Sequence, residues 1–270
     1  MGGVVIVLVW ALSGAGGHSG SKLGGSSKSR LRDSQASVAG AASRGSDVID
    51  RVLASTSYVS VGGGRRREIA LTFDDGPGPD TSRILRVLHR IHAPATFFWI
   101  GRWVPHYRSV AAAEVRAGYP IGSHTQNHPP LAQLSLDDQR REIAHGAGAV
   151  ETLGLPRPRL FRPPYGSFNQ TTLGLLSERR ALMVLWTVDT RDFSSPGTNR
   201  IIYLAVSGAR PGAIILMHDG GGDRRQTVAA LPKIIRLLRR RHYRLVTIPQ
   251  LLQDDPPPAN QAPPHSLAGG

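Results

Sequence analysis

Between positions 68 and 247, short runs of β-branched and aromatic residues alternate with longer stretches whose apolar residues recur at helical spacing. Glu68–Phe73 is a run of the first kind, and Ser82–His92 carries its apolar residues on one helical face. The pattern predicts seven strands, over residues 68–73, 95–100, 120–124, 160–162, 182–188, 213–217 and 243–247. It predicts six helices, over residues 82–92, 110–117, 136–153, 171–180, 200–206 and 227–241.

Strands that alternate with helices favour parallel pairing and right-handed crossovers. Seven such units within about 190 residues fit a small, incomplete α/β barrel better than an open sheet with a second domain. In barrels of this class the chemistry lies on loops at the carboxyl ends of the strands. The folded domain is expected over residues 67–253.

The two ends of the chain differ from this core. Val4–Leu12 is an apolar run followed by small residues, and although no Lys or Arg precedes it, it predicts a secretory signal over residues 1–15 and therefore export. Residues 16–66 are rich in Gly, Ser and Arg and predict a flexible linker. Residues 254–270 predict a disordered Pro-rich tail. The apolar run is too short to cross a bilayer, so we expect no stable membrane span.

Composition narrows the chemistry. The 270 residues contain no cysteine, so disulfides, thiolate metal sites and a cysteine nucleophile are excluded, and a metal would need His, Asp or Glu. The formal net charge is +14, spread along the sequence. No nucleic-acid-binding motif accompanies it, so we expect no nucleic-acid partner, and attraction to an anionic cell-wall polymer is the simpler interpretation.

Five polar clusters follow predicted strands. They are Thr72–Pro77 (TFDDGP), His124–His128 (HTQNH), Phe161–Gly166 (FRPPYG), Asp189–Phe193 (DTRDF) and Leu216–Gly220 (LMHDG). Because the carboxyl ends of parallel strands meet at one end of a barrel, we expect these clusters to lie together.

His124 and His128 are four residues apart and can present their ring nitrogens to one ion. With Asp75 they form a set of two histidines and one carboxylate, which leaves open positions for water and substrate. We expect one divalent metal there, zinc first, with cobalt, nickel or manganese as alternatives. The alternative interpretation of the DDGP segment is a turn in which the aspartate acts as a cap.

Adjacent carboxylates are unfavourable unless their roles differ. An ion bound by Asp75 leaves Asp74 free to act as general base, and Arg162 can orient it with a bidentate contact. His218 ends an apolar strand, where a lone histidine is commonly a core residue. A carboxylate such as Asp192 raises the pKa of an imidazole, so His218 is the candidate proton donor.

In order, these five segments resemble the motifs of the polysaccharide deacetylase family, the NodB-homology domain of carbohydrate esterase family 4. The resemblance implies a distorted (β/α)7-8 barrel in a single α/β domain. It implies Asp74 as base, Asp75, His124 and His128 as metal ligands and His218 as acid, with Arg162 and Asp192 supporting them. It also implies a substrate-binding wall formed by Pro164, Tyr165, Phe193 and Leu216, with the Tyr165 N–H at the oxyanion. Phe193 and Gln126 depart from residues common in the family.

The resemblance implies hydrolysis of N-acetyl groups on N-acetylglucosamine-containing polymers, namely peptidoglycan or chitin oligomers. With the predicted export, we expect a secreted or cell-wall-associated enzyme, and we expect a monomer. Two alternatives stay open. One is an O-acetyl esterase acting on xylan or another acetylated polysaccharide. The other is a catalytically silent domain that binds cell-wall carbohydrate. A serine hydrolase is disfavoured because the sequence contains no G-x-S-x-G motif.

Overall fold

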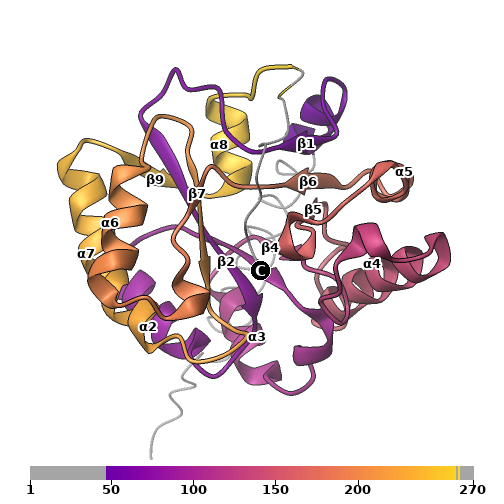
Figure 1. Cartoon of the computed structure of the whole chain (residues 1–270), viewed down its shortest axis with the longest axis horizontal. Helices are drawn as coiled ribbons and strands as arrows, with labels where there is room; N and C mark the ends of the chain where they lie inside the picture. The colour runs from indigo at the N-terminus through magenta and orange to yellow at the C-terminus, as the bar shows by residue number, and fades with distance from the viewer. Residues whose placement is uncertain (1–46, 260, 262–270) are drawn as a thin grey trace, which may run out of the picture. The chain divides into compact units, whose positions relative to one another are not determined.

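The computed structural model of the chain describes residues 47–259 and 261 (Figure 1). The predicted signal segment therefore lies outside the described residues, as does most of the linker and of the tail. Within them, nine strands form one sheet in which every strand pairing is parallel. The strands are β1 (Tyr58–Val59), β2 (Glu68–Gly76), β3 (Thr96–Trp99), β4 (Ile121–Ser123), β5 (Leu160–Phe161), β6 (Leu182–Val184), β7 (Val188–Asp189), β8 (Ile214–His218) and β9 (Arg244–Val246).

The helices alternate with the strands, as the sequence predicts. They are α2 (Thr81–Ile91), α3 (Arg108–Arg116), α4 (Leu136–Glu151), α5 (Gln170–Glu178), α6 (Thr198–Ser207), α7 (Arg225–Arg240) and α8 (Ile248–Asp254). All six predicted helices are confirmed, and α8 is additional. Thr247 caps α8 by accepting a hydrogen bond from Gln250 N–H, and Pro249 occupies its first turn, two start signals that the sequence analysis missed.

The sheet curves so that one stretch of chain contributes strands near both of its ends. Its strand order is β1-β6-β5-β4-β3-β2-β8-β7, with β9 paired to β2. The predicted strand 182–188 is in fact two strands, β6 and β7, separated by three residues. β6 lies next to the terminal strand β1, and β7 is the terminal strand at the other end, so this stretch spans almost the whole order. The fold is the expected distorted α/β barrel.

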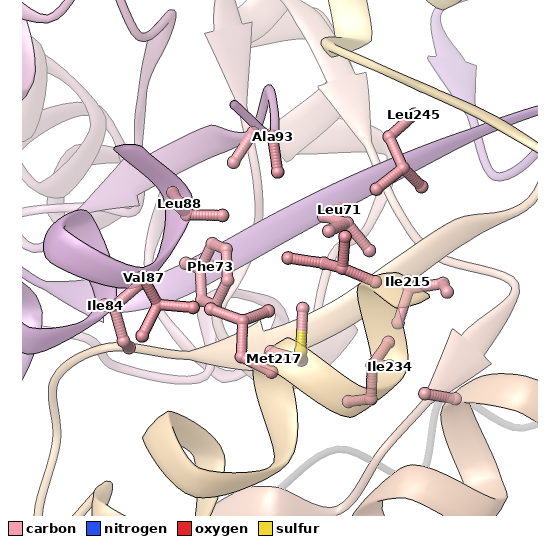
Figure 2. Close-up of a cluster of buried hydrophobic side chains, with 14 of the residues drawn as sticks. Leu71, Phe73, Ile84, Val87, Leu88, Ala93, Ile215, Met217, Ile234 and Leu245 are labelled. Atoms are coloured by element: carbon pink, nitrogen blue, oxygen red, sulfur yellow. The ribbon is translucent and has the colours of Figure 1, made fainter. Parts of the chain in front are cut away.

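Side chains of β2 alternate between two environments. Ile69, Leu71 and Phe73 point outward into an apolar layer under the helices, whereas Ala70 lies in a second cluster on the barrel's inner side. Figure 2 shows this outer layer, where residues of β2 and β8 meet side chains of α2 and α7. The following inward positions are Thr72 and Asp74, so the alternation that builds the core also directs a carboxylate into the barrel.

The structure extends the folded part beyond both predicted boundaries. Residues 47–53 are helical, and Val48, Ile49 and Val52 are buried against the inner apolar cluster. β1 pairs with β6, and in the predicted tail Gln261 accepts a hydrogen bond from Ser60 N–H. The prediction of a flexible linker up to residue 66 is therefore wrong for residues 47–66. A single weak apolar patch packs when the barrel supplies its partner surface.

The sequence predicts no stable membrane span. Among the described residues, no helix is both long and apolar enough to cross a bilayer.

Candidate active site

The polar clusters converge at the carboxyl end of the barrel, where the order of strands explains their proximity. β2 and β8 are neighbours, and their register places Asp74 directly opposite His218. β5 carries Arg162 at its end, and the loop after β7 carries Asp192. Residues separated by more than 140 positions in the sequence thereby share one site.

Asp75 reaches this site because β2 contains an irregularity. Asp74 pairs with Phe98 and Gly76 with the next residue of β3, so Asp75 is an extra residue in the strand. Its φ is 70°, in the left-handed region. In a regular strand, adjacent side chains would point to opposite faces, but a bulge redirects one of them. Both carboxylates consequently line the same pocket.

Asp75, His124 and His128 form a compact set of ligand atoms. Oδ1 of Asp75 lies 3.2 Å from Nε2 of His128 and 3.6 Å from Nε2 of His124. The two Nε2 atoms are 3.2 Å apart, and all three ligand atoms lie within 4.8 Å of one another. Oδ1 of Asp75 is buried without a hydrogen-bond partner in the described structure, which is costly unless a cation compensates it. This donor set fits a divalent ion such as zinc.

The surroundings of His124 prepare it as a ligand. Its Nδ1–H donates a hydrogen bond of 2.7 Å to the carbonyl oxygen of Arg162, which leaves the lone pair of Nε2 directed at the site. Burial, reinforced by the neighbouring His128, lowers the pKa of His124 to about 3, so the imidazole is neutral at neutral pH. Burial also lowers the pKa of His128, whose Nδ1 lies 3.1 Å from the Tyr165 hydroxyl. Neutral imidazoles are what metal binding requires.

Asp74 is held by a fully buried arginine. Nη1 of Arg162 donates to Oδ1 of Asp74 at 2.7 Å and to Thr72 Oγ1 at 2.8 Å. Nη2 and Nε donate to the carbonyl oxygens of Leu185 and Val184, so the guanidinium is fixed by the barrel itself. The predicted bidentate grip is thus a single bond to the carboxylate. Burial raises the pKa of Asp74, while the positive charge of Arg162 opposes the rise.

His218 forms the predicted pair with Asp192. Its Nδ1–H donates to Oδ1 of Asp192 at 2.7 Å, and its backbone N–H donates to Oδ2 at 2.9 Å. The hydroxyl of Thr227, in the first turn of α7, donates to Oδ2 at 2.6 Å. Burial opposes the charged imidazole, but the carboxylate of Asp192 outweighs it and raises the pKa of His218 to about 9. His218 is therefore protonated at neutral pH.

One pocket of about 380 Å³ is lined by Asp74, Asp75, His124, His128 and His218. Of the expected substrate-binding residues, Tyr165, Phe193 and Leu216 line it. Pro164 is buried and does not; its neighbour Pro163 takes that place. Asn127, within the HTQNH cluster, also lines the pocket, although no feature of the sequence singles it out. The other lining residues stand beside the motifs or in other loops: Ile100, Arg102, Trp103, Trp186, Gly221 and Arg224.

Arg224 positions two loops of the site, a role that the sequence did not indicate. It is buried, and its Nε donates to the carbonyl oxygen of Gly220 at 2.7 Å. Its Nη1 donates to the carbonyl oxygen of Phe193 at 3.1 Å. The side chain thus connects the loop after His218 with the loop of Asp192.

Comparison with known proteins agrees with this geometry. The sequence profile described as polysaccharide deacetylase matches residues 62–181. A chitooligosaccharide deacetylase of Bradyrhizobium is 37% identical over 157 residues, which make up 57% of this chain and 71% of that protein. A peptidoglycan-N-acetylglucosamine deacetylase of Bacillus cereus is 40% identical over 186 residues, 68% of this chain and 87% of the relative.

The chain belongs to the polysaccharide deacetylase family. The crystal structure of the Bc1960 peptidoglycan N-acetylglucosamine deacetylase is similar to it with a TM-score of 0.71 and 32% identity, covering 76% of this chain and 95% of that one. The protein is accordingly a hydrolase that acts on amide bonds by deacetylation. Members of the family depend on a metal ion, and the Asp75 set provides a site for one.

The raised pKa of His218 predicts how the stability of this deacetylase depends on pH. The folded value of about 9 exceeds the usual 6.5, so the stabilisation is fully present below pH 6.5 and is lost as the pH rises through 9. The size of the shift corresponds to about 3 kcal/mol. We expect the free energy of unfolding of the wild type to fall by about that much over this range, relative to His218→Gln. Urea titrations in the presence of a chelator measure it, and parallel pH profiles would contradict it.

Thr227 supports the Asp192 carboxylate and provides a second test. Thr227→Val keeps the shape of the side chain but removes a hydrogen bond to a charged group, so we expect a loss of about 1.5–3 kcal/mol of unfolding free energy. Thr171→Val is the matched control, because Thr171 also lies in a first helical turn and its hydroxyl makes no hydrogen bond within the described residues. Equal losses in the two variants would show that the contact with Asp192 contributes nothing.

Proposed function

We propose that the protein removes N-acetyl groups from N-acetylglucosamine-containing polymers, either peptidoglycan or chitin oligomers, in a metal-dependent reaction that yields a free amine and acetate. One observation carries the proposal: the Asp75, His124 and His128 set faces the same pocket as a carboxylate held by an arginine and an imidazolium held by an aspartate. The relatives named for deacetylation of these glycans support the choice of substrate.

Asp75, His124 and His128 would hold the ion, which when bound supplies a Lewis acid for the acetyl carbonyl and lowers the pKa of water. Asp74 accepts the proton from the attacking water, and the hydrogen bond from Arg162 keeps the carboxylate oriented. The backbone N–H of Tyr165 stabilises the negative charge that develops on the carbonyl oxygen. Tyr165 has a φ of 58°, in the left-handed region.

His218 completes the reaction. As the carbon–nitrogen bond breaks, the proton on its imidazolium passes to the departing nitrogen, which leaves as a neutral amine while the acetyl carbon becomes acetate. Asp192 keeps the imidazole charged and fixes its orientation. Leu216 and Phe193 form an apolar wall suited to the acetyl methyl, and the ring of Phe193 stands edge-on to His218, with 5.6 Å between centroids.

The same machinery would cleave an ester, so an O-acetyl esterase acting on xylan is the alternative activity. A silent carbohydrate-binding domain is the alternative without catalysis. The proposal disfavours the latter because each group that it assigns to the reaction lines the pocket or contacts one that does.

Acetate release from three acetylated substrates distinguishes these possibilities: N-acetylglucosamine tetramers, intact peptidoglycan and acetylxylan. The zinc-loaded protein should release acetate from at least one of the first two faster than from acetylxylan. Faster release from acetylxylan would favour the esterase. Retention of the glycans without release from any of them would favour the silent domain. The same panel with zinc, cobalt, nickel or manganese identifies the most active metal.

We also propose that the protein is exported and acts at the cell wall, because Val4–Leu12 has the character of a signal segment and the candidate substrates are wall polymers. Fractionation of cells that produce the full chain tests this, and retention in the cytoplasm would contradict it.

A further inference from the structure

Some cationic residues on the described surface have acidic residues on the same helix, and others do not. On α4, Arg140 lies 3.3 Å from Asp137, and Arg141 pairs with Asp138. By contrast, α2 and α7 contain neither Asp nor Glu. α6 also contains neither Asp nor Glu, but its one cation is Arg200. Among the α-helices that the structure describes, several cations without an acid therefore occur on α2 and α7 alone.

Five exposed cations on these two helices form what we call the α2/α7 cationic face. They are Arg86, Arg90, Lys233, Arg236 and Arg240. Within the part of the chain that the structure describes, no carboxylate lies within 4.0 Å of any of them. Each helix carries one pair of like charges four residues apart, and such pairs destabilise a helix by about 0.2–0.5 kcal/mol.

The two helices lie side by side, so their exposed cations occupy adjoining parts of the surface. Nη1 of Arg239 donates to the carbonyl oxygen of Ile91 and Nη2 to that of His92, both at 3.0 Å, which ties the end of α7 to the end of α2. Their inner sides share one apolar core, where Ile84 and Ile234 are both buried. Packed helices are about 8–10 Å apart and residues four apart rise by about 6 Å, so the five charges occupy a patch roughly 15 Å across.

The fold does not require most of these cations. Cations stabilise the last turn of a helix through its dipole, which accounts for Arg90 and Arg240. Arg86, Lys233 and Arg236 precede the last turn and gain little from this effect. A binding partner with negative charges would explain why they occur without acidic neighbours.

We propose that the α2/α7 cationic face binds a flexible linear polyanion, one that carries closely spaced phosphate or carboxylate groups, while the pocket stays open to acetylated glycan. α7 follows the loop that contributes Gly221 to the pocket wall, and none of the five cations lines the pocket. A lipid surface is disfavoured because the exposed large hydrophobic residues of the described chain are Leu136, Tyr165 and Tyr203, outside both helices.

The test compares two variants of the full chain that lower the net charge equally. Arg86→Glu/Lys233→Glu/Arg236→Glu reverses three charges of the face. Arg140→Glu/Arg141→Glu/Arg157→Glu, the control, reverses three exposed arginines that have acidic partners. Binding to inorganic polyphosphate and to poly-L-glutamate is measured by fluorescence anisotropy. We expect the first variant to lose at least about tenfold in affinity and the control less than about threefold.

Salt dependence and activity provide the remaining readouts. With five charges engaged, an increase of salt from about 50 to about 200 mM should weaken wild-type binding by about 100-fold. Both variants should keep wild-type acetate release from soluble N-acetylglucosamine tetramers and a cooperative thermal transition. Equal losses of affinity in the two variants would overturn the proposal. So would tighter binding to phosphatidylglycerol vesicles or to duplex DNA than to both flexible polymers.

Discussion

Asp74→Asn is expected to lower kcat for acetate release by about 10²- to 10⁴-fold, because the amide cannot accept the proton of the attacking water. The substitution preserves size, and the amide oxygen can still accept the hydrogen bond from Arg162 that Oδ1 accepts at 2.7 Å. It leaves the fully buried guanidinium without a counterion, however, so the variant should also be less stable. Acetate release and thermal unfolding of the zinc-loaded variant measure the two effects.

Substrate affinity separates loss of the base from a general disturbance of the site. Because Asp74 acts in the chemical step, KM should change far less than kcat. Asn127→Ala is a useful control, since Asn127 lines the same pocket but has no part in the proton transfers, and it should alter KM more than kcat. Wild-type kcat in Asp74→Asn would remove Asp74 from the mechanism.

Asp75→Ala is expected to change stability in opposite directions, depending on whether metal is present. In chelator, the variant should match or exceed the wild type, because it removes a buried oxygen that has no hydrogen-bond partner in the described structure. With zinc at about 100 times its Kd, the wild type should gain about 2.7 kcal/mol. Zinc should stabilise the variant much less than the wild type. The variant should also release acetate at least about 10³-fold more slowly, because it lacks the bound Lewis acid.

Calorimetry with and without zinc measures the stabilities of the wild type and of Asp75→Ala under both conditions. Glu142→Ala serves as the control, since Glu142 accepts hydrogen bonds from the backbone of Gln126 and Asn127 but offers no ligand to the set. A wild type that zinc does not stabilise, or an Asp75→Ala variant that it stabilises equally, would contradict the proposed ligand.

Much of the architecture was predictable because it depends on local periodicity. The alternation in Glu68–Phe73 and the apolar face of residues 82–92 are strong signals, and both elements occur where the sequence places them. The proximity of the motifs followed from a general property of parallel barrels. The direction of Asp74 and His218 into the barrel follows from the alternation of β2 and β8.

Other features depend on long-range contacts that no local pattern encodes. The split of the predicted strand 182–188 arises because its two halves pair with different neighbours around a closing barrel. The packing of residues 47–53 depends on an inner apolar cluster whose other members come from distant parts of the chain, such as Leu182 of β6 and Leu251 of α8. The sequences of residues 182–188 and 47–53 contain no feature that identifies the pairing partner or the packing surface.

Within the site, backbone geometry was the main omission. Assigning both Asp74 and Asp75 to one pocket already implied that the strand is irregular, since regular neighbours face apart, and that implication would have predicted the bulge. Pro163 and Pro164 are both buried, and no feature of the sequence indicates which of them the turn places at the pocket. Thr227 had a weaker signal, namely a hydroxyl near the start of a predicted helix.

The central claim is that one divalent ion is bound by Asp75, His124 and His128. Anomalous diffraction from crystals soaked in zinc tests it most directly. The account predicts a single strong peak at about 2.0–2.2 Å from Oδ1 of Asp75 and from Nε2 of both histidines. A peak bound instead by other residues of the pocket, or no peak at these three atoms, would contradict it.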